Sequence, residues 1–488
     1  MSDPKSRLRG AFSLIGNTLY AANDGNPFDR DGVIALCIAN ISSKSDEVID
    51  SHANMKDSDW IPAFCRSQLN QYVDYPNNLT RDQKEEVRTS GDYSGRWLLE
   101  LLQNMDDAMG PKDRSKYIGT KGLGFLSVMQ IGENPEIFSG SYNFLFSQQK
   151  TKNALISKGV SEDRAKNAPR FQVPWPATPD EVTIDLLKSG FKTVIKLEIK
   201  DDSLDDVKEQ LQSIEHQFLL FSQNIDELSL SFDTKKISFK RSAKLLNGDH
   251  SRSKSQIDII IERSDQKKKT ETWTKWQRNW ESAAQTQKRS SCMFCLQKKG
   301  DICVPTPKHT KVHNFYPTEQ SSEIRGYLHL SFELSSDRKN LQMWGDKKDA
   351  SWGSKSCDPE NKQLVAETKA LIIEDVIDDP EVPTETILKT FSSLNKYSDE
   401  EVKKGEPLKR VKSKLIDAIS KHPFLPRFGG GCTDLNSIIL WDHNFIDCLE
   451  EVEGIQPYQF AAKDLELLFD EMRKYEVSEL SAAEMFIC

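Results

Sequence analysis

The chain has 488 residues, of which 37% are hydrophobic and 29% are charged, with a net charge of −9. These values describe a polar globular protein of two to four domains and argue against a chain devoted to wrapping nucleic acid. No apolar run approaches the roughly 18 residues needed to span a bilayer. The N-terminus lacks the apolar core of a secretory signal, and the nine scattered cysteines fit reduced thiols. We therefore expect a cytoplasmic protein with no membrane partner.

The first feature in chain order is a turn between two hydrophobic runs. Residues 19–22 read LYAA, and Asn23, Asp24 and Gly25 follow them. Turns favour these three residue types, so this stretch by itself predicts a strand that ends in a turn. Residues 46–95 come next and are polar and helix-prone.

Residues 97–108, WLLELLQNMDDA, have the length and spacing of a helix. Glu100, Asn104 and Asp107 stand at i, i+4 and i+7, which places them on one narrow stripe. The opposite arc is apolar and is formed by Leu98, Leu101, Leu102, Met105 and Met109. A buried carboxylate costs several kcal/mol unless a partner compensates it. A ligand that carries a metal ion would be such a partner.

A glycine-rich stretch, IGTKGLGF, follows at residues 118–125. Glycines allow close approach of a ligand or a positive φ, and the N–H groups exposed by such a turn form an anion nest. With the polar stripe this predicts a Mg-nucleotide site. Asn104 would offer an uncharged oxygen to Mg²⁺, and Glu100 would polarise the attacking water. The alternative is a buried helix whose polar residues cap loops, next to a tight turn.

These two stretches resemble a known superfamily. Residues 100–108 resemble the N-box of the GHKL ATPases, and residues 118–140 resemble their glycine box, most closely that of sacsin-like proteins. The resemblance implies a two-layer α+β Bergerat-type sandwich, hence an α/β fold class, that binds ATP and Mg²⁺. It implies Glu100 as general base, Asn104 as Mg²⁺ ligand and Asp107 as a neighbour of the nucleotide. The residues it implies around the phosphates are Gly119, Thr120, Lys121, Gly122, Leu123, Gly124 and Phe125.

One element of the superfamily pattern stands at an unusual place. Ordinary members carry a strand and an adenine-binding D-x-G-x-G box between the two boxes, where this chain has only residues 109–117. Residues 19–45 resemble the missing strand, box, helix and lid start. We therefore expect a circularly permuted domain, since a site is assembled in space and re-joined surface ends are tolerated. The alternative is a plain turn whose likeness is coincidental.

The permuted adenine box departs from the pattern. Asn23 takes the place of the adenine-contacting Asp, Asp24 and Gly25 follow, and Pro27 replaces the second glycine. An amide oxygen accepts from the adenine amino group less strongly than a carboxylate does. Lys44 resembles a lid-start residue that reaches a phosphate, although an isolated lysine is more often a solvated charge.

Residues 151–345 predict a second, α/β domain after the first one at 1–150. Strand-like alternation covers 191–199 and 225–239, and 207–221 has the pattern of an amphipathic helix. Residues 327–342 resemble a stretch found after the ATPase domain of sacsin-like proteins and the R-x-x-L-Q loop of the large heat-shock chaperone. This resemblance implies that Arg338 reaches the γ-phosphate, a role that suits a guanidinium fork. Alternatively, Arg338 forms a salt bridge with Asp337.

Residues 346–488 predict a mainly helical third domain. Apolar spacing typical of helices occurs at 363–376, 408–421 and 462–475, and the glycines at 429–431 indicate a loop.

Two weaker patterns remain. Cys292 and Cys295, with Cys303 and His309 or His313, have the residue types of a zinc site, or they are buried thiols.

Trp273, Trp276 and Trp280 stand at i, i+3 and i+7 among basic residues. This spacing favours a helix that packs its tryptophans on a sheet. The alternative is a surface that stacks single-stranded nucleic acid.

The expected function is that of a slow ATPase whose nucleotide state closes two domains on a protein client. Relatives of this kind often dimerise, so a homodimer is the expected assembly. Two alternatives are a non-hydrolysing scaffold that uses ATP as a clasp, and a clamp that acts on nucleic acid.

Overall fold

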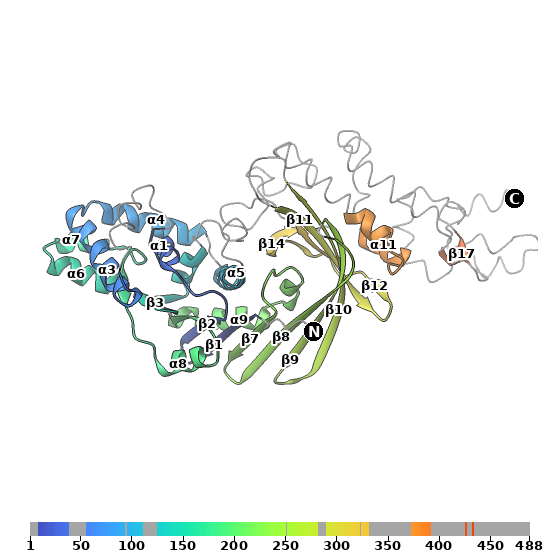
Figure 1. The fold of residues 1–488 in the computed structure, drawn as a ribbon, viewed down its shortest axis with the longest axis horizontal. Helices are drawn as coiled ribbons and strands as arrows, with labels where there is room; N and C mark the ends of the chain where they lie inside the picture. The colour runs from blue at the N-terminus through green and yellow to red at the C-terminus, as the bar shows by residue number, and fades with distance from the viewer. Residues whose placement is uncertain are drawn as a thin grey trace, which may run out of the picture. The chain divides into compact units, whose positions relative to one another are not determined.

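The computed structural model describes residues 8–38, 55–92, 95–110, 124–249, 251–281, 289–322, 324–330 and 372–391, and the pairs 425–426 and 432–433. The protein is a mixed α/β structure (Figure 1). It divides into two compact units. Unit 1 contains residues 1–242 and 259–270, and unit 2 contains residues 243–258 and 271–488. The three-domain division at 150 and 345 stays a prediction.

The sheet of unit 1 has the strand order β10-β9-β8-β7-β1-β2-β6-β3-β4-β5. Its strands are β1 (Arg9–Ile15), β2 (Thr18–Asn23), β3 (Gly132–Ser139), β4 (Tyr142–Phe146), β5 (Pro174–Pro176), β6 (Thr193–Ile199) and β7 (Glu227–Phe232). Three longer strands have residues in both units: β8 (Lys235–Gly248), β9 (Arg252–Arg263) and β10 (Gln266–Glu281). β1 pairs with β7 in parallel and with β2 antiparallel. The strand expected at 191–199 is confirmed as β6.

The helices of unit 1 cover both faces of this sheet (Figure 1). They are α1 (Arg30–Ile38), α3 (Asp57–Asp74), α4 (Asn78–Asp92), α5 (Trp97–Met109), α6 (Gln148–Ser157), α7 (Glu162–Ala165), α8 (Glu181–Lys188) and α9 (Leu204–Ser213), with the 3-10 helices η2 (Gly124–Gln130), η3 (Asp201–Ser203) and η4 (His216–Leu220). The helix expected over 207–221 ends at Ser213, because Ile214 leaves helical geometry with ψ at 120°.

The face of the sheet that each residue occupies follows from strand alternation. Ala11, Tyr20 and Ala22 face α8, where they pack with Val182 and Leu186. The alternate residues of β1 and β2, which include Gly10 and Asn23, therefore face the opposite side.

Unit 2 has the strand order β14-β13-β15-β11-β10-β9-β8, with β12 paired to β11. Its own strands are β11 (Arg289–Lys299), β12 (Ile302–Val304), β13 (Lys311–Asn314), β14 (Tyr316–Ser321) and β15 (Tyr327–Leu330). Residues 372–377 are helical, α11 is Thr384–Phe391, and β16 (Leu425–Pro426) pairs with β17 (Cys432–Thr433). The helices expected at 408–421 and 462–475 and the loop at 429–431 lie outside the described residues.

The strands β5 and β14, at the two ends of the whole strand order, contain proline. β5 reads PWP, and the second residue of β14 is Pro317. Proline has no backbone N–H, so it is tolerated at a sheet edge and not in a central strand. No helix in the described ranges is long and apolar enough to cross a membrane.

Candidate functional site

Helix α5 packs its apolar arc on the sheet as the sequence predicts. Its five apolar residues Leu98, Leu101, Leu102, Met105 and Met109 are all buried. A Cβ placed on Gly10 would lie 3.1 Å from Met105 Sδ, so the helix rests closely on β1. Because Gly10 and Asn23 are cross-strand partners, α5 covers the same face of the sheet that Asn23 occupies.

The three residues of the polar stripe of α5 differ in their exposure to solvent. Glu100 is 1% exposed, and Asn104 and Asp107 are half-buried. Arg96, which precedes the first turn of the helix, brings its Nε to 3.9 Å from Glu100 Oε1. The sequence pattern did not single out this arginine. An ion pair one turn apart on a helix is a common arrangement, and here both side chains are largely buried.

The turn after β2 contacts the C-terminal end of α5. A Cβ on Gly25 would lie 2.6 Å from the carbonyl carbon of Ala108, so this close approach requires glycine. Asn26 N donates to Ala108 O at 2.6 Å, and Asn26 Nδ2 donates to Gly110 O at 2.8 Å. Two stretches about 80 residues apart in sequence are thus joined at the end of α5.

Asn23 and Asp24 play different parts in this turn. Asn23 is 4% exposed, and its Oδ1 accepts from Gly25 N at 3.1 Å. Asp24 accepts from Arg9 N at 2.7 Å and from Arg9 Nε at 3.0 Å. Asp24 therefore ties the turn to the start of β1. The observed contacts of Asp24 are structural, whereas Asn23 lies on the α5 face.

Two hydroxyl residues that sequence reasoning missed lie beside Asn23. Thr193 of β6 is the cross-strand partner of Asn23, and Ser139 of β3 is the partner of Thr193. The two hydroxyls are 2.6 Å apart, and Phe28 N donates to Ser139 Oγ at 2.9 Å. The sequence shows that the strand predicted at 191–199 begins with polar residues. It does not show that Thr193 of this strand pairs with Asn23.

Another residue that the sequence analysis missed is Asp106, which is completely buried. Its Oδ1 accepts from Asn224 N at 2.7 Å, Ile225 N at 2.9 Å and Ser222 Oγ at 3.0 Å, and its Oδ2 accepts from Gln223 N at 3.0 Å. This carboxylate anchors α5 to the loop before β7. Asp106 stands four residues after Leu102 and so falls on the apolar arc of the helix. This position in the sequence could have indicated that its carboxylate is buried.

The other predicted site residues divide by where they fall. Gly124 begins η2, which packs against α5, and Phe125 is a buried core residue with its ring edge-on to Phe171 at 5.6 Å. The residues outside the described part of the chain are Lys44, Gly119, Thr120, Lys121, Gly122, Leu123 and Arg338.

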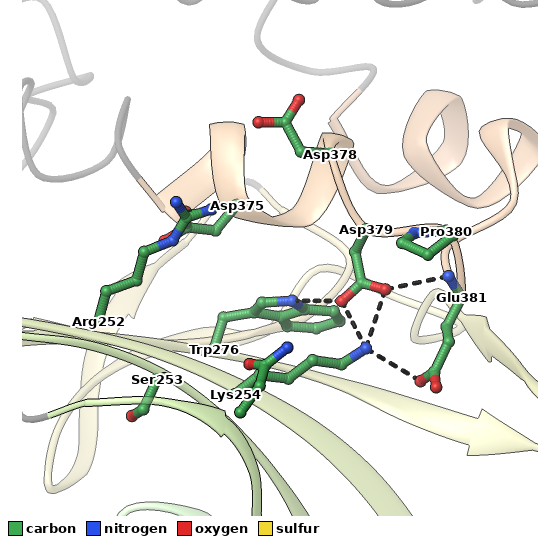
Figure 2. A pocket seen from close by; sticks show the side chains of 11 residues that line it. Arg252, Ser253, Lys254, Trp276, Asp375, Asp378, Asp379, Pro380 and Glu381 are labelled. Atoms are coloured by element: carbon green, nitrogen blue, oxygen red, sulfur yellow. Dashed lines mark hydrogen bonds and ion pairs between the residues drawn. The ribbon is translucent and has the colours of Figure 1, made fainter.

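Unit 2 contains a cavity of about 550 Å³ lined by the β8–β9 hairpin, Trp276, Asp375 and residues 378–381 (Figure 2). Lys254 Nζ lies 2.7 Å from Asp379 Oδ2 and 3.1 Å from Glu381 Oε2. Trp276 Nε1 donates to the same Asp379 oxygen at 2.8 Å. The charged groups beside this cavity are therefore engaged with one another.

Two arginines of the unit 2 sheet also form ion pairs with the segment 372–391. Arg252 and Arg278 each approach Asp375 to 2.6 Å, and Arg278 does so with two nitrogens. Asp375 is buried, and Ile372 and Val376 beside it are buried as well. The network fixes residues 372–391 to the sheet of unit 2.

The expectation of a tryptophan-bearing helix at 273–280 is wrong. The segment belongs to strand β10. Trp273 and Trp276 are both 3% exposed although an odd spacing puts them on opposite faces of the strand. A strand covered on both faces has no period-two pattern, so its aromatic spacing imitated a helix.

The cysteine pattern corresponds to buried thiols. Cys292 and Cys295 stand three residues apart on β11, so their side chains point to opposite faces. Burial raises the pKa of the Cys295 thiol to about 12, so this side chain is a neutral thiol at neutral pH. Among the described residues no group of three or more His, Cys, Asp or Glu side chains is arranged to hold a metal ion.

No family model matches the sequence, and comparison with curated proteins finds no match either.

Proposed function

We propose that unit 1 is a GHKL-type nucleotide-binding domain that holds a Mg-purine nucleoside triphosphate against α5 and hydrolyses it. ATP is the nucleotide that the sequence resemblance implies. The observation that carries the proposal is the contact of Gly25 and Asn26 with Ala108 and Gly110 at the end of α5. A circularly permuted adenine box must lie next to α5, because the two together form the nucleotide site. A turn that resembles the box only by coincidence has no reason to lie there.

The proposed roles follow the chemistry of each side chain. Asn23 and Thr193, neighbours on the α5 face, would contact the base. Asn104 would give Mg²⁺ one oxygen, with the phosphates and water as its other ligands. Glu100 would orient the attacking water.

The remaining roles rest on the resemblance. The glycine stretch 119–124 would surround the phosphates, and Arg338 would reach the γ-phosphate. An arginine that senses the γ-phosphate couples hydrolysis to domain closure, so the proposed output is a switch that grips a protein client, with slow turnover. A homodimer is the proposed assembly.

One observation favours a second candidate, a nucleotide-binding scaffold without hydrolysis. Arg96 lies 3.9 Å from Glu100, and an ion pair competes for the carboxylate lone pairs that a general base needs. A nucleic-acid clamp has less support, because Trp276 and Arg278 are engaged by Asp379 and Asp375.

The test is titration of the full chain with Mg-nucleotide, together with steady-state phosphate release. Asn104→Ala should weaken Mg-dependent binding, and Glu100→Gln should abolish phosphate release while binding is kept. Glu85→Gln, which changes a partly exposed carboxylate on α4, is the control and should alter neither.

Three outcomes separate the candidates. Release that depends on Glu100 supports the hydrolase. Binding without release above the Glu100→Gln background supports the scaffold. If no purine nucleoside triphosphate binds, both candidates fail.

A further inference from the structure

The second half of strand β8 is an open edge of the unit 2 sheet. β8 lies between β7 and β9 in the strand order, and β7 pairs with its first residues, Lys235–Lys240. Arg241 N still donates to Asp226 O at 2.7 Å, directly before β7 begins. From there β8 continues to Gly248 with β9 on one side, and no strand that the structure describes lies on the other.

The backbone groups on the open side belong to alternate residues. Arg241 N is directed to the β7 side, whereas Lys236 O accepts from Ser264 N on the β9 side at 2.9 Å. Successive residues of an antiparallel strand direct their N–H and C=O groups to opposite neighbours. The residues that present these groups at the open edge are therefore Ala243, Leu245 and Asn247.

This edge is exposed and carries two leucines. Every residue from 242 to 248 is exposed, so neither face of the strand is covered. Leu245 is 60% exposed and Leu246 is 39% exposed, and no other two consecutive large hydrophobic residues in the described ranges are both exposed. Neighbouring residues of a strand point to opposite faces, so each face carries one leucine. Apolar residues on an unpaired edge favour the addition of another strand.

Residues 242–248 lack the proline that protects β5 and β14. Their one charged residue is Lys244. A lysine protects an edge where an added strand would place a second cation opposite it. The register of the added strand therefore decides whether Lys244 opposes pairing.

A second copy of this segment fits the edge in one two-fold register. If Leu245 lies opposite Leu245 of the other copy, Ala243 lies opposite Asn247, and each pair exchanges both backbone hydrogen bonds. On the other face Lys244 then lies opposite Leu246, so no lysine meets a lysine. The stem of a lysine covers a leucine while its ammonium group stays in solvent.

We propose that residues 243–247 of β8 pair antiparallel with the same residues of a second copy, about a two-fold axis at Leu245. The inference goes beyond the proposed function, because it assigns the surface of the proposed homodimer and does not depend on the nucleotide site. So short a pairing buries less than the roughly 1,200 Å² of a standard interface. We therefore expect a dimer that dissociates in the micromolar range.

Sedimentation velocity of the full chain at a series of concentrations measures the self-association. Leu245→Pro removes one N–H group from the open side and should raise the dissociation constant of the dimer at least about tenfold. Residue 245 directs no backbone group to β9, so the hairpin keeps its own hydrogen bonds. Urea unfolding of the variant checks that the fold is kept.

Leu245→Lys tests the same position without a backbone change. It places two ammonium groups opposite each other at the axis, so the dissociation constant should again rise at least about tenfold and fall with added salt. Val87→Lys is the matched control, because Val87 on α4 is 62% exposed. It adds the same charge elsewhere and should change the dissociation constant by less than about twofold.

Cross-linking tests the register. Under a thiol oxidant, Leu245→Cys should form a covalent dimer in excess of the wild-type chain, because opposite residues of a hydrogen-bonded pair have Cα atoms about 5.5 Å apart. Leu246→Cys is the control, since its counterpart lies on a diagonal of about 7–8 Å. Equal cross-linking by both variants overturns the register at Leu245.

The failures are distinguishable from failure of the nucleotide site. A dimer that persists in Leu245→Pro and Leu245→Lys forms through another surface and overturns the inference. A wild-type chain that stays monomeric overturns both the inference and the proposed homodimer, and leaves this edge to a strand of a different protein. Neither result changes the test of nucleotide binding.

Discussion

Asp106 and Asp107 are adjacent on α5 yet differ in their surroundings. Asp106 is completely buried and accepts four hydrogen bonds from residues 222–225, whereas Asp107 is half-buried on the polar stripe. The helical period was enough to separate them, since Asp106 falls on the apolar arc. The partners of Asp106 lie more than 110 residues away, and helical spacing carries no information about them.

Replacing Asp106 by Asn should destabilise the chain by about 3 kcal/mol, because an amide N–H₂ would face backbone donors inside the protein. Asp107→Asn should cost less than about 1 kcal/mol. Urea unfolding of the two variants measures both values. Equal losses would mean that the loop before β7 is held by other contacts.

At the scale of elements, the turn after β2 and the end of α5 behave as one piece. A Cβ on Gly25 would lie 2.6 Å from the carbonyl carbon of Ala108, and Asn26 N donates a hydrogen bond to the carbonyl oxygen of the same residue. Gly91 in α4 offers a contrast, since no described heavy atom lies within 4 Å of the position where its Cβ would be.

Gly25→Ala should therefore push the turn away from α5, at a cost of about 1–3 kcal/mol, and weaken nucleotide binding. Gly91→Ala should leave binding unchanged and stabilise the chain by up to about 1 kcal/mol, because alanine favours a helix. Thermal unfolding and nucleotide titration measure these effects. Normal nucleotide binding by Gly25→Ala would contradict a site built on this contact.

An element was predicted correctly from the sequence where one of its faces is exposed, and wrongly where both faces are buried. α5 exposes one stripe, so its period revealed both the helix and its buried arc. β10 is covered on both faces around Trp273 and Trp276, and its spacing misled the prediction. Asn23 was singled out by resemblance alone. Its neighbour Thr193 was found through strand register, which depends on pairing across 170 residues of chain.

At the scale of the whole molecule, a pair of buried histidines links the stability of unit 2 to pH. His313 of β13 and His329 of β15 are partners in register, and Phe315 N donates to His329 Nδ1 at 2.9 Å. Burial lowers the pKa of His313 to about 4 and that of His329 to about 3, from an ordinary value of 6.5. Both are therefore neutral in the folded protein at neutral pH.

The unfolded chain binds these two protons below pH 6.5, while the folded chain does so only near pH 4 and below. Stability is therefore complete above pH 6.5 and falls as the pH drops toward 4, by up to about 1.4 kcal/mol per pH unit for each histidine. Urea unfolding at several pH values measures this slope.

Carboxylates also titrate in the lower part of this range, so the comparison is made between variants. His329→Gln should reduce the slope between pH 6.5 and 4.5. His309→Gln, at an exposed position, should leave it as in the wild type. If His329→Gln had the wild-type slope, the buried pair would not be the source of acid sensitivity.

The prolines at the ends of the two strand orders bear on how copies of this protein meet. An incoming strand needs a continuous row of amide hydrogens, and Pro174, Pro176 and Pro317 interrupt that row at the outermost strands. Each proline removes one amide hydrogen from that row, so addition of a strand at β5 or at β14 is disfavoured. Folded chains should therefore not join to one another through these two strands.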